Sequence, residues 1–94
     1  MWMRHDWQFK GGYNAGLAAG VAEQGLGRFG FRVLGKGDGW VLGEINGGLI
    51  LTQAMGVGDG GSSHVMVVAA SDNEGSLAAC NQLSDHIRSA TKFD

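Results

Sequence analysis

The stretch WVLGEINGGLILTQAM, residues 40–55, decides the fold of this chain. Apolar runs lie on both sides of Asn46-Gly47, a dipeptide that favours a two-residue type I′ turn because both of its positions need a positive φ. The stretch therefore predicts a β-hairpin with strands over 40–45 and 49–55. A hairpin places its two strands in antiparallel order.

Three further strands are predicted on either side of this hairpin, over 4–9, 29–34 and 64–70. Each is an apolar or alternating run with a glycine-rich segment on at least one side, a pattern typical of short strands in a sheet. Within the first of them, Trp7 and Phe9 share one side, and Asp6 and Gln8 share the other. We therefore expect this strand to be half buried.

Two helices complete the predicted elements. Tyr13, Leu17 and Val21 recur at every fourth position, which indicates a helix from Tyr13 to about Gly25, ended by Gly25 or Gly27. Residues 71–74 read Ser-Asp-Asn-Glu, a match to the capping box that begins a helix. The second helix then carries an apolar stripe formed by Leu77, Cys80, Leu83, Ile87 and Ala90.

The order β-α-β-β-β-β-α predicts one α+β domain over residues 1–94. Without a regular βαβ alternation, we expect a two-layer sandwich of about five mainly antiparallel strands with both helices on one face. The strands over 49–55 and 64–70 are apolar at consecutive positions, so both of their faces are apolar. The second face is then covered by a curled sheet edge or the N-terminal segment, or it forms a subunit interface or a ligand groove.

The composition excludes several classes of partner. With 44% hydrophobic and 17% charged residues among 94, the chain is too apolar for intrinsic disorder, and self-association is expected. Seven basic and nine acidic residues are scattered along it, so no basic stripe predicts nucleic-acid binding. No long apolar run predicts a membrane span. One cysteine and no signal-peptide pattern favour a cytoplasmic protein.

Residues 25–30 read Gly-Leu-Gly-Arg-Phe-Gly and match the G-x-G-x-x-G motif of dinucleotide-binding proteins letter for letter. The motif is functional when it follows a strand and opens a helix, because the phosphate then meets the N-terminus of the helix. Here it follows a predicted helix and precedes a strand. We therefore interpret it as a helix end with a tight turn, and we predict no cofactor.

An enzyme remains the alternative to a binding protein, with a hydrolytic or metal-dependent site on the loop from Asp59 to His64. Asp59, Ser63 and His64 lie within six residues of one another, but a catalytic triad needs each group to be aimed by a rigid scaffold. Asp38 and Asp59 each stand between glycines, a pattern more typical of turns than of calcium sites. No spacing of histidines predicts a metal site.

The leading hypothesis is a small cytoplasmic binding protein, a homodimer that uses an apolar sheet face or groove to bind a protein or a small molecule. A subunit of a larger assembly is a third possibility. Cys80 is expected in the core. The candidate ligand or interface residues are Trp40, Ile50, Thr52, Met66 and Val68, together with Arg32 and Glu44, which face each other if the register of their strands places them opposite.

Overall fold

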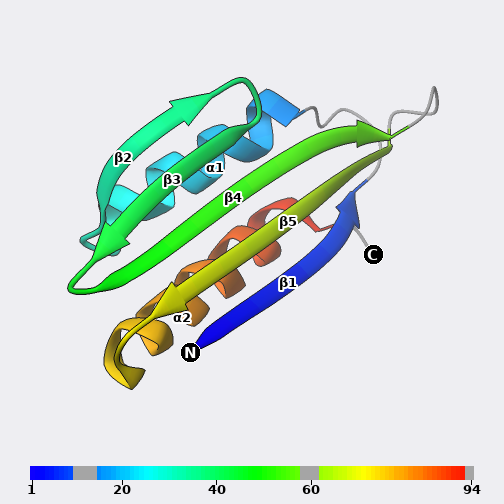
Figure 1. Cartoon of the computed structure of the whole chain (residues 1–94). Helices are drawn as coiled ribbons and strands as arrows, with labels where there is room; N and C mark the ends of the chain where they lie inside the picture. Colours follow the sequence, from blue (N-terminus) through cyan, green and yellow to red (C-terminus); the bar gives the residue numbers. More distant parts are fainter. Residues whose placement is uncertain (10–14, 58–61, 93–94) are drawn as a thin grey trace.

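The computed structural model describes residues 1–9, 15–57 and 62–92, and seven elements follow one another along them (Figure 1). The strands and helices are β1 (Trp2–Phe9), α1 (Ala15–Arg28), β2 (Arg32–Gly37), β3 (Trp40–Ile45), β4 (Gly48–Val57), β5 (Ser62–Ser71) and α2 (Glu74–Thr91).

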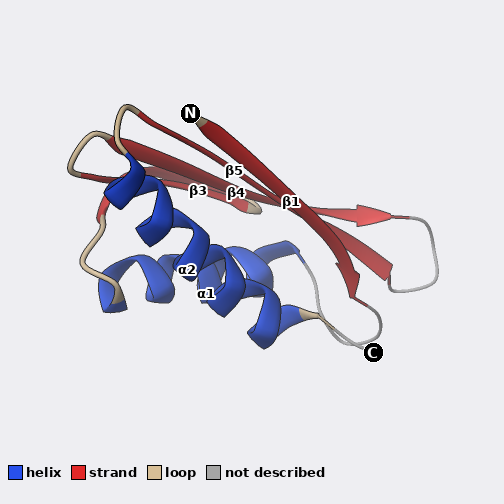
Figure 2. Ribbon diagram, turned by 90° about the horizontal axis from the view of Figure 1, so that it is seen from below, coloured by secondary structure: helices blue, strands red, loops and turns tan. Residues whose placement is uncertain are grey.

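The five strands form one antiparallel sheet in the order β1-β5-β4-β3-β2. Both helices pack on the same face of it, and Figure 2 shows the resulting two layers. The predicted α+β fold, with its element order and its helices on one face, is confirmed. The sheet order also places the N-terminal strand β1 at one edge, beside the strand that leads into α2.

The predicted hairpin is formed by β3 and β4, with Ile45 paired to Gly48 across a two-residue turn. Asn46 has a φ of 37° and Gly47 a φ of 85°, as a type I′ turn requires. The turn is also anchored on α2, because Ser76 Oγ donates a hydrogen bond of 2.7 Å to the carbonyl oxygen of Asn46. The Asn46-Gly47 turn, which the sequence predicts from local residues, therefore also contacts a helix residue 30 positions later in the chain.

The second helix begins where it was expected, but the predicted capping box is wrong. The N-cap is Asn73, whose Oδ1 accepts a hydrogen bond of 2.8 Å from the backbone nitrogen of Ser76. Ser71 instead ends β5, and its hydroxyl oxygen accepts a hydrogen bond of 3.0 Å from the backbone nitrogen of Asn73. Ser71 therefore belongs to β5, where it pairs with Met1 of the chain's first residues, and the N-cap of α2 lies two residues later than the capping box predicts.

The first helix continues to Arg28 and ends in a Schellman motif, so the G-x-G-x-x-G segment is a helix end, as predicted. Gly30 has a φ of 80°, and the nitrogen of Phe31 donates to the carbonyl oxygen of Leu26 at 2.8 Å. Gly25 does not end the helix. It allows α1 to approach α2, because a Cβ at this position would lie only 2.8 Å from Leu83 Cδ1.

The core lies between the helices and the sheet. Trp7 is buried there, and its indole nitrogen donates a hydrogen bond of 2.8 Å to Thr91 Oγ1 on α2. Cys80 is fully buried, as expected, and burial raises the pKa of its thiol. His86 packs edge-on against Phe29 with ring centroids 5.4 Å apart.

Candidate interaction surface on the uncovered sheet face

The face of the sheet that points away from the helices is the candidate site, and we call it the uncovered face. Alternation along each strand assigns its residues, because the buried residues of the same strands all point toward the helices. Its members are Trp2, Arg4, Asp6 and Gln8 of β1; His64, Met66, Val68 and Ala70 of β5; Leu49, Leu51, Gln53 and Met55 of β4; Trp40, Leu42 and Glu44 of β3; and Arg32 of β2.

The centre of the uncovered face is apolar. The strand registers place Val68, Leu51 and Leu42 side by side on β5, β4 and β3, and all three are half buried. Around this central row the larger apolar side chains are more exposed. Trp2 is 71% exposed, Leu49 46%, Met55 45% and Trp40 36%. A contiguous exposed patch of this kind marks an association surface more often than single scattered apolar residues do.

The indole ring of Trp40 lies on the side of the uncovered face that is next to β2. Gly37 pairs with Trp40, and a Cβ at Gly37 would collide with the indole ring. A Cβ at Gly35 would lie 3.4 Å from Trp40 Cη2. The ring therefore lies over the two glycines of β2, which leave it the room to do so.

Paired charges flank the apolar centre on both sides. On β1, Arg4 Nε donates to Asp6 Oδ2 at 2.8 Å, and His64 Nε2 of β5 lies 2.7 Å from Asp6 Oδ1. The hydrogen bonds from Arg4 and then from His64 lower the pKa of the Asp6 carboxyl to about 2. On the opposite side, Arg32 and Glu44 occupy paired positions and form an ion pair, as the sequence suggested.

Five of the predicted interface residues lie on the uncovered face, namely Arg32, Trp40, Glu44, Met66 and Val68. Ile50 and Thr52 do not. They point toward the helices and are only 1% and 2% exposed. Consecutive apolar positions in β4 conceal which of its faces is turned inward, so Leu49 and Leu51 were not predicted, nor was Leu42, which pairs with Leu51 from β3. No local signal identified them, because the two faces of β4 are similarly apolar in the sequence.

The predicted catalytic loop is only partly described. Asp59 and the side chain of Ser63 lie outside the described residues, whereas His64 is held by Asp6 on β1. Asp38 lies in the two-residue turn between β2 and β3. Within residues 1–9, 15–57 and 62–92, no three His, Cys, Asp or Glu side chains come together as a metal site would require.

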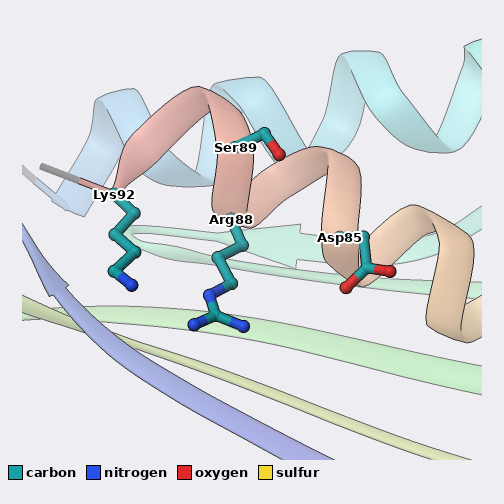
Figure 3. Close-up of a pocket in the computed structure, with 4 residues that line it drawn as sticks. All are labelled: Asp85, Arg88, Ser89 and Lys92. Atoms are coloured by element: carbon teal, nitrogen blue, oxygen red, sulfur yellow. The ribbon is translucent and has the colours of Figure 1, made fainter. Parts of the chain in front are cut away.

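Surface hollows lie beside the sheet, away from its apolar centre. One is lined by Asp85, Arg88, Ser89 and Lys92 on α2 (Figure 3). A second lies between the start of β1 and α2, and a third between Met1, Leu49 and Ala70 at one end of the sheet. None of these three includes the central row of Val68, Leu51 and Leu42.

No protein-family model matches this chain, and no curated protein or solved structure matches it either. In the part of the chain that the structure describes, no helix is both long and apolar enough to span a membrane. An inference about function therefore rests on the geometry of the uncovered face.

Proposed function

We propose that this chain is a binding protein that acts as a homodimer and docks a partner protein on its uncovered face. The observation that carries this proposal is the apolar central row of Val68, Leu51 and Leu42, with paired charges on both flanks. An apolar centre inside a polar rim is the usual anatomy of a protein interface. Exposed tryptophan and methionine, both enriched at such interfaces, adjoin the central row.

The shape of the uncovered face favours a protein over a small molecule. Small-molecule sites are concave and enclose most of their ligand, whereas none of the three surface hollows includes the central row of the uncovered face. Strands about 4.8 Å apart with a rise of about 3.3 Å per residue give this face roughly 20 by 20 Å. That area is below the roughly 800 Å² per partner of a standard interface, so the face suits a small and reversible contact.

The proposal is tested by placing a photo-crosslinking residue at Leu51, identifying the protein captured in the native cell, and measuring its affinity with purified components. Val68→Asp places a charge in the centre of the face, so we expect it to weaken this affinity at least tenfold. Gln82→Asp adds the same charge on the exposed side of α2 and serves as the matched control. Circular dichroism checks that both variants fold.

An unchanged affinity of Val68→Asp would contradict the proposed docking surface, and so would the absence of any specific crosslink from Leu51. The homodimer is tested separately by native mass, which should equal two chains of 9.8 kDa.

A further inference from the structure

The two edge strands of the sheet differ in how well they are protected against pairing with another strand. β2 has an irregular register between Val33 and Gly35 and carries Lys36, and both a bulge and a lysine discourage pairing at an edge. β1 pairs with β5 over eight consecutive residues without any irregularity. In the described part of the chain, no strand lies on the other side of β1.

The backbone groups at the free edge of β1 can be assigned from its pairing with β5. Met1 and Ser71 exchange two hydrogen bonds, with the nitrogen of Ser71 donating at 2.9 Å and that of Met1 at 3.2 Å. In an antiparallel pair, hydrogen-bonded positions alternate with positions whose backbone groups point away. The even-numbered residues of β1 therefore direct their N–H and C=O groups toward the free edge.

These outward positions are complementary to themselves. If β1 pairs with the β1 of a second copy about an axis through His5, Arg4 lies opposite Asp6 of the other chain, and Trp2 lies opposite Gln8. A register centred on Arg4 or on Asp6 instead places two like charges directly opposite, which is destabilising. The register centred on His5 also pairs the full length of the strand.

We infer that the homodimer forms by this antiparallel pairing of β1 with β1 of a second copy, so that two five-stranded sheets become one continuous sheet. The inference rests on the homodimer of the proposed function and assigns its interface. It leaves the uncovered face free and joins the two copies of that face into one larger platform. That enlargement compensates for the small area of a single face.

The charges of α2 support the same axis. His5 Nδ1 lies 2.8 Å from Ser84 Oγ, and Trp7 bonds Thr91, so α2 runs alongside β1 in the same direction. A two-fold axis at His5 therefore brings the N-terminal part of α2 alongside the C-terminal part of the other α2. Glu74 stands at the first of these ends and Arg88 at the second, so the two ends that meet carry opposite charges. Lys92 projects from the same side of α2 as Arg88 (Figure 3), whereas Asp85, next to Ser84, lies close to the axis and adds nothing to this complementarity.

Charge reversal tests the interface. Arg4→Asp leaves two acidic residues and Asp6→Arg two basic residues on each strand, so we expect each variant alone to raise the dimer dissociation constant at least tenfold. An equimolar mixture of the two variants should restore a heterodimer, because every cross-strand pair is then of opposite charge. The intrachain Arg4–Asp6 pair stays broken in both chains, so recovery reports on contacts between chains only.

The matched control for charge reversal is Glu44→Arg, which breaks the ion pair on the opposite side of the sheet and should leave the dimer unchanged. Analytical ultracentrifugation of each variant and of the mixture provides the measurement. Single variants that dimerise like the wild type, or a mixture that stays monomeric, would overturn the inference.

Cysteine crosslinking tests the register. At a non-hydrogen-bonded antiparallel pair the Cα atoms lie about 4.5 Å apart, within the range of a disulfide, so His5→Cys should form a linked dimer under oxidation. Gln8→Cys should not, because its symmetry mate lies roughly 20 Å away along the strands at about 3.3 Å per residue. The native Cys80 is fully buried in both variants. Linkage through position 8 and not through position 5 would overturn the register.

The two proposals fail in distinguishable ways. A dimer that survives Arg4→Asp and Asp6→Arg but is lost in folded Val68→Asp places the second copy on the uncovered face and contradicts the pairing of β1. A wild-type chain that is monomeric contradicts the homodimer and the β1 interface together. Neither result decides whether Leu51 contacts another protein, which the photo-crosslink measures directly.

Discussion

Both faces of β4 are apolar, but they are built from different side chains. Ile50, Thr52 and Ala54 point toward the helices and are buried, whereas Leu49 and Met55 point outward and are exposed. The same division runs through β5, where Val65, Val67 and Ala69 are buried and Met66 and Val68 are half buried. On β4 and β5 the covered side thus carries β-branched and small residues, whereas the uncovered side carries mainly longer ones, with Val68 and Ala70 as exceptions.

On these two strands the size and shape of the side chains therefore separate the helix-packing side from the uncovered side better than hydrophobicity does. Small residues allow the helices to approach the sheet closely: a Cβ at Gly43 of β3 would collide with Leu26 of α1. The uncovered face carries leucine, methionine and tryptophan, and methionine and aromatic residues are enriched at interfaces.

The largest expected effect is on the free energy of unfolding, when aspartate is placed on one or the other face of β4 at two adjacent residues. Ile50→Asp buries a carboxylate without a partner, so we expect a loss of more than about 4 kcal/mol, enough to unfold a domain of this size. Leu51→Asp points to the other side and should lower the free energy of unfolding by about 1 kcal/mol or less. Urea denaturation followed by circular dichroism compares them, and equal losses would contradict the assignment of faces.

A second comparison uses the tryptophans of β1, which point to opposite faces. Thr91→Val removes the acceptor of the buried Trp7 indole N–H, and an unsatisfied buried donor costs about 1–3 kcal/mol. The double variant Trp7→Phe/Thr91→Val should lose less free energy of unfolding than the two single variants lose in sum, because both changes remove the same hydrogen bond. Trp2→Phe on the uncovered face is the control and should leave the unfolding midpoint within error. Additive losses at Trp7 and Thr91 would argue against their hydrogen bond.

Local signals in the sequence predicted the fold because most elements are bounded by residues with strong backbone preferences. Asn46-Gly47 specified the hairpin without help from the rest of the molecule. The first helix, expected to end at Gly25 or Gly27, instead continues to Arg28, with Gly30 as the left-handed residue that follows it. The N-cap of α2 was misplaced from Asn73 to Ser71 because Ser71 is held in β5 by Met1, at the far end of the sequence. A contact of that range leaves no local pattern.

The candidate surface was only partly predictable for the same reason. Arg32 and Glu44 lie on neighbouring strands, so their pairing followed from one hairpin register. Asp6 and His64 are 58 positions apart and meet only because β1 is placed beside β5. The phase of β4, which turns Ile50 inward, depends on helices that pack from elsewhere in the chain. Sequence patterning therefore identified that a second apolar face exists, but not all of its members.

The smallest expected effect is the dependence of stability on pH through Asp6. The pKa of its carboxyl is lowered from 3.8 to about 2 in the folded chain, so its contribution to stability is complete above about pH 4 and disappears as the pH falls toward 2. The group is exposed, and surface ion pairs contribute little, so the change is small. Urea midpoints of the wild type and Asp6→Asn, measured between pH 5 and 2 at a dilution where both are monomeric, should converge at the acidic end. A gap that widens on acidification would show that Asp6 is better stabilised when protonated, against its contacts with Arg4 and His64.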